Sequence, residues 1–489
     1  MAQCILAIDQ GTTGSTALVV SAQGKILSKV NKEFRQIFPK PGWVEHDPDE
    51  IWQSVLKAIA EAMALAKVSG EHIAAVGITN QRETVVHWDP DTGQKLYNAI
   101  VWQCRRTAPE CLKLRNAGYE SKIKTKTGLV LDPYFSGTKI KWLSENVKSK
   151  KGIFGNIDSY LVWRLSGGAA YVTDVSNASR TMLMNLQTGE WDPDLLKLFK
   201  VKRAQLPTIV DSSGVVGKVK GISGLLDGTP IAGIAGDQQS ALFGQLGHKV
   251  GDSKCTYGTG SFILLNTGNK IVRSKHGLLT TVAWRLKGEK KLTYALEGGA
   301  FICGAAVQFL RDQLGFVKSS AEIEDLARSV EDSAGVEFVP ALTGMGAPYW
   351  MPDARGKILG LTRGTSRAHI ARATLEAMAL QNVDILEAMQ KDAKVKIKSL
   401  RVDGGAAANN LLMQFQSDFL GSQILRPKSI ETTSMGAAFL AGLGVGFWKD
   451  LKELHYLAET DRIFTANLTS AKRTLRLKKW RKAVMAGEK

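Results

Sequence analysis

The segment DQGTTG at residues 9–14 combines side chains and backbone groups that can hold a phosphate. It follows an apolar, β-prone run at residues 4–8 and opens a turn. Glycines allow backbone N–H groups to point at a phosphate, and the hydroxyls of Thr12 and Thr13 add donors. Asp9, at the strand end, can hold Mg²⁺ directly or through water. A polar hairpin turn is the alternative interpretation, whereas a Walker P-loop is excluded because the chain has no Gly-x-x-x-x-Gly-Lys-Ser/Thr segment.

Two further glycine-rich turns lie at predicted strand ends. GTGS at residues 258–261 separates two apolar strands, and DGGA at residues 403–406 lies between a strand and a predicted helix. Each turn taken alone is also compatible with ordinary turn chemistry. Three such turns at strand ends predict a nucleotide that is held by the backbone of both halves of the chain.

Asp237 is the candidate for proton transfer. It lies in the segment GDQQ at residues 236–239, directly after a predicted strand at 231–235. A carboxylate at a strand terminus can act as a general base toward a hydroxyl. The alternative is a helix N-cap, a position that Asp favours.

A charged pair and two aromatic residues could together bind a small polyol. Arg82 and Glu83 supply donors and acceptors for hydroxyl groups, and Trp102 and Tyr134 supply an apolar wall for C–H edges. The alternative is a surface ion pair with two unrelated core aromatics.

The elements that must position these residues alternate between helix and strand. Strands at 4–8, 17–20 and 26–30 with short turns predict an antiparallel meander. Asp47 and Pro48 predict the start of a helix that stops near 69–70, and a strand follows at 73–79. The later part is predicted to hold strands at 256–265 and 400–402, a long helix capped by Ser366 and a helix at 409–420 closed by Gly421.

Length and composition limit the class of protein. A chain of 489 residues predicts at least two domains, and the glycines between 244 and 251 could form a hinge between two α/β halves. Five cysteines without a Cys-x-x-Cys pair predict free thiols in a reduced, cytoplasmic protein.

The charged residues limit the possible partners. The formal charge of +18 comes from scattered Lys and Arg, so we expect no nucleic-acid partner. The dense basic stretch at 472–482 predicts a solvated last helix. The most apolar stretch, 435–448, is too short for a membrane span.

Eight segments together resemble the glycerol kinases, within the larger family of carbohydrate kinases. They cover the chain from about residue 5 to about 450, in family order. The two most specific segments are TNQRET at 79–84 and VWQCRRT at 101–107. The other six are IDQGTT at 8–13, DPYFS at 132–136, GDQQ at 236–239, TYGTG at 256–260, APYW at 347–350 and DGGA at 403–406.

The resemblance implies a fold, two cofactors and a set of site residues. The fold is α/β, with two ribonuclease H-like domains of the actin-like ATPase type flanking a catalytic cleft: 1–246 for glycerol and 247–489 for the nucleotide. ATP and Mg²⁺ are implied as cofactors, glycerol as the substrate, Asp237 as the catalytic base, Asp9 as the metal ligand, and a homodimer or homotetramer as the assembly. The implied glycerol-binding residues are Arg82, Glu83, Trp102, Tyr134, Asp237, Gln238 and Phe262. The implied nucleotide and phosphate contacts are Thr12, Thr13, Gly258, Thr259, Gly304, Gln308, Gly405 and Asn409.

The chain departs from the pattern of the resemblance at two places. Thr16 stands where many glycerol kinases carry Arg, and Gly228-Thr229 is followed by Pro230 where members inhibited by fructose 1,6-bisphosphate carry Arg. Two rival functions are a kinase for a longer sugar such as xylulose, and an actin-like or chaperone-like ATPase. The ATPase would need a partner-binding domain, whereas the kinase segments extend over most of this chain.

Overall fold

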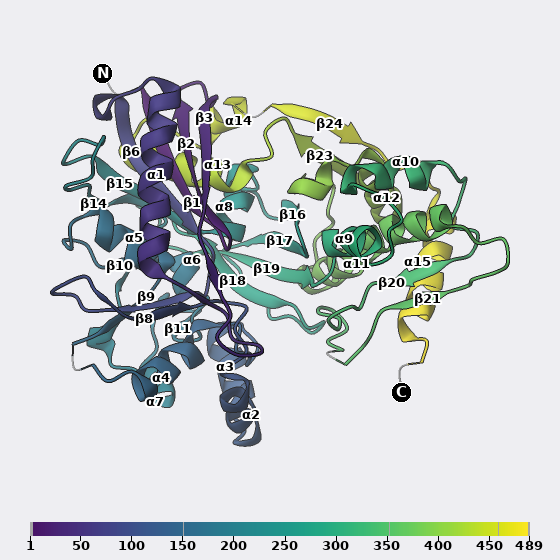
Figure 1. Cartoon of the computed structure of the whole chain (residues 1–489), viewed down its shortest axis with the longest axis horizontal. Coiled ribbons are helices and arrows are strands. Elements are labelled where there is room, and N and C mark those ends of the chain that lie inside the picture. The colour runs from purple at the N-terminus through teal and green to yellow at the C-terminus, as the bar shows by residue number, and fades with distance from the viewer. Residues whose placement is uncertain (1–2, 150, 352, 458, 488–489) are drawn as a thin grey trace.

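Two β-sheets, one from each half of the chain, organise the molecule (Figure 1). The computed structural model describes residues 3–149, 151–351, 353–457 and 459–487. In Figure 1 the first sheet lies with the purple N-terminal strands, and the second lies with the green and yellow elements of the C-terminal half.

The first sheet has six strands in the order β14-β15-β6-β1-β2-β3. Its strands are β14 (Ser213–Lys218), β15 (Pro230–Gly236), β6 (Ile73–Asn80), β1 (Cys4–Gln10), β2 (Gly14–Ser21) and β3 (Ile26–Glu33). β1, β2 and β3 form an antiparallel meander, and β6 and β15 add parallel strands beside β1. The predicted meander and the predicted strands at 73–79 and 231–235 are confirmed.

The second sheet repeats this topology. Its strands in spatial order are β18 (Leu279–Trp284), β19 (Thr293–Ala300), β17 (Ser261–Gly268), β16 (Ser253–Tyr257), β22 (Ser399–Asp403), β23 (Gln423–Pro427) and β24 (Thr460–Phe464). β16, β17 and β19 form the meander, and β22 and β23 are the parallel additions. Five strands of each sheet, β3-β2-β1-β6-β15 and β19-β17-β16-β22-β23, share order and direction, which supports the predicted pair of ribonuclease H-like α/β domains.

Capping residues define the helices that the sequence predicts. The Asp47 carboxylate accepts the N–H of Asp49 (2.9 Å) at the start of α1 (Pro48–Ala66), which ends at Lys67, slightly before the predicted stop. α11 (Arg367–Ala393) begins after Ser366, whose N–H is donated to His369 Nδ1. Asn409 caps α12 (Asn410–Leu420), and Gly421 ends it in a left-handed conformation with φ 68°.

Two helices cross between the sheets with their backbones in contact. α8 (Asp237–Gly244) follows β15, and α13 (Thr432–Val445) lies against it and against β1, β6 and β15. A Cβ at Gly244 would lie 2.0 Å from the carbonyl oxygen of Thr432, and a Cβ at Gly436 would lie 1.9 Å from that of Ser240. The crossing therefore requires glycine at both positions. The division at 246/247 stays a prediction, since α13 comes late in the sequence but packs on the first sheet.

The remaining elements form smaller units around the two sheets. A five-stranded sheet comprises β4 (Gln36–Ile37), β5 (Glu45–His46), β8 (Lys95–Ile100), β7 (Val85–Trp88) and β9 (Ile153–Asn156). Two-stranded sheets pair β10 (Val172–Asp174) with β13 (Thr208–Val210), β11 (Met184–Asn185) with β12 (Glu190–Trp191), and β20 (Glu337–Val339) with β21 (Lys357–Leu359). The other helices are α2 (Ala108–Asn116), α3 (Glu120–Thr127), α4 (Ser136–Asn146), α5 (Ile157–Leu165), α6 (Val175–Ala178), α7 (Pro193–Phe199), α9 (Gly304–Asp312), α10 (Ile323–Arg328), α14 (Leu451–Leu457) and α15 (Ser470–Met485).

Three sequence-based expectations about surface and core can be compared with the structure. α15 covers the predicted last helix, and its Trp480 is buried and donates to Asp384 (2.7 Å). All five cysteines are buried and free, as predicted. Within the described ranges, no helix combines the length and the apolar character needed to cross a membrane.

Candidate active site

Arg82 and Asp237 meet where two parallel strands end. Arg82 follows β6, and Asp237 follows the neighbouring strand β15, so both side chains emerge at the same edge of the first sheet. Arg82 Nε lies 3.1 Å from Asp237 Oδ1. The N-cap of α8 is Gly236, and Asp237 is its first helical residue, so the helix-cap alternative is not what the structure shows. About a third of the Asp237 side chain is exposed, which leaves the carboxylate accessible to a substrate.

A buried ion-pair network fixes the Arg82 guanidinium. Its Nη1 and Nη2 donate to the two carboxylate oxygens of Glu297 on β19, at 2.6 and 3.0 Å. Arg180 Nη2 donates to the same carboxylate (3.0 Å). Burial alone would raise the pKa of Glu297, but the charges of Arg180 and Arg82 lower it to about 2. Glu297 is therefore ionised at neutral pH and holds both arginines in place.

Glu83 has an unusual backbone conformation beside this network. Its φ of 63° lies in the left-handed region, which costs free energy for a residue with a side chain and is typical of functional sites. Arg180 Nε donates to its carboxylate (2.6 Å), and the buried Lys139 Nζ donates to its backbone carbonyl (3.2 Å). Burial raises the pKa of Glu83, and the charges of Arg82 and Arg180 lower it. The effect of burial is the larger one, so the pKa of Glu83 is raised overall. Arg180 and Lys139 thus hold Glu83 in this conformation, with its carboxylate 3.9 Å from Arg82 Nε.

The predicted aromatic wall is partly assembled. The rings of Trp102 and Tyr134 meet edge to face with centroids 5.6 Å apart, and Arg82 Nη2 lies 3.4 Å from the Tyr134 hydroxyl. Trp102 Nε1 donates to the Thr12 hydroxyl (3.0 Å), which links the wall to the predicted phosphate turn. Phe262 lies on β17 opposite Thr256 and near Gly299, and it forms no ring pair with Trp102 or Tyr134 among the described residues. The structure therefore brings Arg82, Trp102 and Tyr134 together but places Phe262 apart from that contact.

Gln238 is held by a buried lysine. Lys254 Nζ donates to Gln238 Oε1 and to the Thr256 hydroxyl (2.7 Å). Burial lowers the pKa of Lys254, and the negative charges of Asp403 and Asp237 partly offset that effect. Lys254 therefore orients the Gln238 amide, which the sequence places among the glycerol ligands.

Two carboxylates, the half-buried Asp9 of the first sheet and the buried Asp403 of the second, each contact a residue at the start of α13. Ser434 Oγ lies 3.3 Å from Asp9 Oδ2, and the Thr432 hydroxyl donates to Asp403 Oδ2. Burial, followed by the charges of Asp237 and Glu431, raises the pKa of Asp9 to about 7. Asp403 Oδ1 is buried and finds no hydrogen-bond partner in the described part of the chain. Carboxylate oxygens of this kind suit Mg²⁺, because Mg²⁺ lowers the cost of a buried negative charge and prefers oxygen ligands.

A pocket of about 430 Å³ in the second half contains the predicted nucleotide contacts. It is formed between the β16–β17 turn, α9, α10, α11 and the turn before α12. Apolar side chains of Val307, Ile323 and Met378 supply surfaces for a flat ring. The six predicted residues that line it are Gly258, Thr259, Gly304, Gln308, Gly405 and Asn409. Thr13, the remaining predicted phosphate contact, is exposed in the β1–β2 turn.

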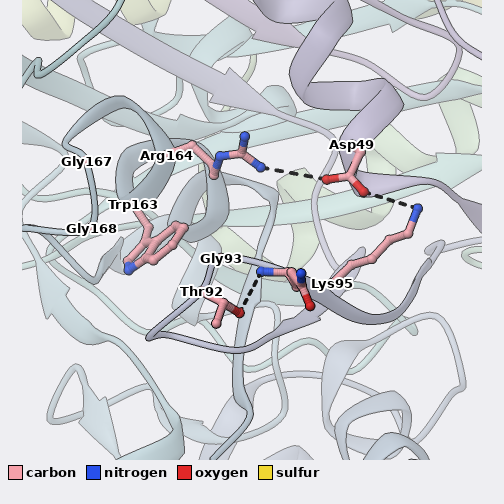
Figure 2. A pocket seen from close by; sticks show the side chains of 9 residues that line it. Asp49, Thr92, Gly93, Lys95, Trp163, Arg164, Gly167 and Gly168 are labelled. Carbon is pink, nitrogen blue, oxygen red and sulfur yellow. Dashed lines mark hydrogen bonds and ion pairs between the residues drawn. The ribbon is translucent and has the colours of Figure 1, made fainter.

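A larger pocket of about 640 Å³ lies elsewhere and includes none of the predicted site residues (Figure 2). It is an open depression between the start of α1, the β7–β8 turn and the end of α5. Its charged groups are already paired, since Asp49 lies 3.2 Å from Lys95 and 3.8 Å from Arg164. The smaller pocket beside the β16–β17 turn is therefore the better candidate for a nucleotide.

Sequence reasoning missed three charged residues of the site: Arg180, Glu297 and Lys254. All three are buried, and Arg180 Nη1 has no hydrogen-bond partner within the described residues. Glu297 and Lys254 are the only charged residues of their strands, β19 (TYALEGGA) and β16 (SKCTY). A lone charge in a strand was the available signal, because a buried charge must be paired to be tolerated.

Comparison with known proteins defines the class. The family model for the FGGY family of carbohydrate kinases, N-terminal domain, matches residues 4–244, and the model for the C-terminal domain of that family matches residues 253–445. The chain therefore belongs to the FGGY family of carbohydrate kinases.

Individual relatives narrow the class. The chain is 56% identical to a glycerol kinase of Bdellovibrio bacteriovorus over 99% of both chains. It is similar to Plasmodium falciparum glycerol kinase, solved with ADP, with a TM-score of 0.94 and 38% identity over 99% of this chain and 98% of that one. Xylulose kinase from Lactobacillus acidophilus is similar with a TM-score of 0.88 and 25% identity over 99% of each chain. The resemblance and the fold class predicted from the sequence are confirmed.

Proposed function

We propose that the protein transfers the γ-phosphoryl group of ATP to a terminal hydroxyl of glycerol, giving sn-glycerol 3-phosphate and ADP. The observation that carries this proposal is the contact between Arg82 and the accessible Asp237 carboxylate (3.1 Å), beside the Trp102–Tyr134 pair. Donors, acceptors and an apolar wall within one small site suit a short polyol. Similarity to glycerol kinases supports the same substrate.

Asp237 acts as the general base in this proposal. The terminal hydroxyl oxygen of glycerol forms a bond to Pγ while the bond from Pγ to the leaving oxygen of ADP breaks, and Asp237 accepts the hydroxyl proton. A positioned base contributes about 10²–10⁴-fold to the rate. Arg82 and Glu83 bind the other hydroxyls, with Gln238 and Tyr134 beside them, so that one terminal hydroxyl points at phosphorus.

The proposal also includes a nucleotide site and a metal site. Gly258, Thr259 and Gly405 hold ATP through the turns at the pocket in the second half, and Gly304, Gln308 and Asn409 line its other side. Thr12 and Thr13 face the phosphates from the first half. Asp9 would hold Mg²⁺, which when bound neutralises charge on the β- and γ-phosphate oxygens. Phe262 would add an apolar wall on the side of the second sheet.

A coupled assay of ADP production tests the proposal. Glycerol, xylulose, ribulose and gluconate are each offered at saturating MgATP, and ADP production is also measured without an acceptor. We expect ADP production to depend on glycerol and to be far faster with glycerol than with the longer substrates. A preferred pentulose would favour the longer-sugar kinase, and acceptor-independent turnover would favour the ATPase.

The cellular location and the assembly remain part of the proposal. Five buried free thiols suit a reducing compartment, which supports a cytoplasmic location. A homodimer or homotetramer is the expected assembly, and light scattering coupled to size exclusion measures it.

A further inference from the structure

An ion pair joins the first sheet to the residue that precedes α13. Lys29 on β3 lies 2.5 Å from Glu431, with 47% of the Lys29 side chain and 23% of the Glu431 side chain exposed. Glu431 directly precedes Thr432 and Ser434, which contact Asp403 and Asp9. The charge of Lys29 also acts on Asp9, the carboxylate that the proposed function assigns to Mg²⁺.

Strand register places Lys29 on the face of the sheet that carries Asp9. Asp9 pairs with Thr16 across β1 and β2, and Thr16 pairs with Asn31 across β2 and β3. Paired residues share a face, and residues two apart in a strand share it too, so Lys29 lies on the same face as Asn31. The Asn31 amide donates to the uncharged Thr16 hydroxyl (2.9 Å). This face therefore carries a positive charge at Lys29 and none at Thr16.

The carboxylates around Asp9 would repel a bound triphosphate unless cations offset them, and Lys29 would add a positive charge to that of the Mg²⁺ that Asp9 would hold. Asp9, Asp237, Asp403 and Glu431 are all carboxylates, and Lys29, Asp237 and Glu431 all act electrostatically on the Asp9 carboxylate. Arg82 is committed to Glu297, and Lys254 is buried against Gln238. An exposed ion pair contributes little stability, so Lys29 can exchange partners at small cost.

We propose that Lys29 binds the terminal phosphate of ATP by releasing Glu431, an inference that rests on the function proposed above. The phosphate offers more negative charge and more acceptor oxygens than one carboxylate, so the exchange is favourable. The flexible four-carbon stem of lysine allows the ammonium to turn from Glu431 toward the cleft. Lys29 is thus a binding residue supplied by the first half of the chain to a nucleotide that the second half mainly holds.

Lys29→Met tests the inference, with Lys32→Met as the matched control. Lys32 lies on the same strand but pairs with Glu61 of α1 (2.5 Å), on the opposite face of the sheet. For Lys29→Met we expect the KM for MgATP to rise about 10-fold or more, the loss of one charge-assisted hydrogen bond. The KM for glycerol should stay within about twofold, because the lost charge acts at the phosphate and not at glycerol. Lys29→Arg should restore most of the MgATP affinity, because it returns a positive charge to the same position. ATP binding at equilibrium should weaken more than ADP binding.

The double variant Lys29→Met/Glu431→Gln distinguishes a direct contact from simple neutralisation of Glu431. It has the same net charge as the wild type. If Lys29 contacts phosphate, the double variant keeps the raised KM for MgATP; if it returns to the wild-type KM, the inference is wrong. A KM for MgATP in Lys29→Met equal to that in Lys32→Met would also overturn it. Should the wild type not phosphorylate glycerol, the proposed function fails, while the equilibrium binding of ATP to the same variants still decides the role of Lys29.

Discussion

Arg82 and Glu297 form a two-pronged ion pair between the two halves of the chain. Arg82 follows β6 of the first sheet, and Glu297 lies on β19 of the second. Arg82 Nη1 donates to Glu297 Oε2 at 2.6 Å, and Arg82 Nη2 donates to Glu297 Oε1 at 3.0 Å. The pair is almost fully buried. The guanidinium that contacts Asp237 is therefore oriented by a residue from the opposite half.

Glu297→Gln should destabilise the protein. Two buried arginines would lose their shared carboxylate, and removing one partner of a buried ion pair costs about 3–5 kcal/mol. We expect a lower urea midpoint at pH 7, measured by tryptophan fluorescence. The exposed Glu331→Gln serves as the control and should unfold like the wild type.

The same variant predicts a pH dependence. The pKa of Glu297 is lowered from 4.5 to about 2 in the folded protein, so its stabilisation is fully present above pH 4.5 and is lost as the pH falls toward 2. The difference in urea midpoint between wild type and Glu297→Gln should therefore be largest near neutral pH and should narrow between pH 4.5 and pH 3. A difference that stays constant over this range would contradict the role given to the ionised carboxylate.

Asp237→Asn should keep the fold but lower kcat by at least about 100-fold, because the amide cannot accept the proton. The KM for glycerol should change less than kcat, since the side chain keeps its shape. Initial rates at saturating MgATP measure both values, and circular dichroism checks the fold. Asp91→Asn, which removes a charge from an exposed surface pair, is the control and should be fully active. A kcat near that of the wild type in Asp237→Asn would remove Asp237 from its assigned role.

Trp102→Ala should weaken glycerol binding by about 1–3 kcal/mol through lost apolar contact. Trp102→Phe separates the two functions of the indole, because it keeps a ring but removes the Nε1 hydrogen bond to Thr12. We expect Trp102→Phe to retain most of the glycerol affinity, and both values can be read from glycerol titrations of the initial rate. Equal losses in the two variants would assign the effect to the hydrogen bond instead of the wall.

The sequence predicts those candidate site residues that belong to a short local motif. It does not predict contacts between distant segments. The glycine turns at 258–260 and 403–406 could be recognised because each is one short segment, and the structure places residues of both beside the same pocket. The choice between a base and a helix cap at Asp237 needed structural context: Gly236 is the N-cap of α8, and the role of Asp237 as a base stays a prediction. The Arg82–Asp237 contact depends on the parallel pairing of β6 and β15, which a strand pattern alone does not specify.

The fold shows the same division. The meander at 4–30 and the helices begun by Asp47 and Ser366 follow from local rules for strands and caps, and the structure confirms them. The position of α13 on the first sheet does not follow from such rules. It depends on Gly77 and Gly233, where a Cβ would lie 2.2 and 2.4 Å from the α13 backbone. Contacts between segments so distant in sequence carry no short-range signal.

Fructose 1,6-bisphosphate at millimolar concentration should inhibit little or not at all. The loop at residues 225–232 contains no Arg or Lys, and Pro230 lacks an N–H donor. Asp227 adds negative charge there, and its carboxylate accepts the N–H of Gly221 (2.7 Å). Lys218 and Lys220 line the shallow pocket beside Asp227, but a lysine lacks the planar fork that grips a phosphate with two hydrogen bonds.

An initial-rate titration at saturating ATP and glycerol, at low and high enzyme concentration, measures this insensitivity. Lys218→Ala and Lys220→Ala are tested alongside the wild type. Strong saturable inhibition of the wild type would contradict the prediction. Loss of that inhibition in the two lysine variants would then locate the site at the loop.

The backbone contact between α8 and α13 has a mechanical consequence for catalysis. Gly244 lies at the crossing, and Asp237 stands at the other end of α8, about 10 Å away at a rise of 1.5 Å per residue. At Gly244 and Gly436 the two backbones are in direct contact, so no rotamer change at these points can absorb a relative rotation. A rotation of about 5° at Gly244 would therefore carry Asp237 through an arc of about 1 Å, a displacement large enough to change the rate about 100-fold. The angle at which α8 and α13 cross at Gly244 and Gly436 therefore sets the position of the Asp237 carboxylate at the start of α8.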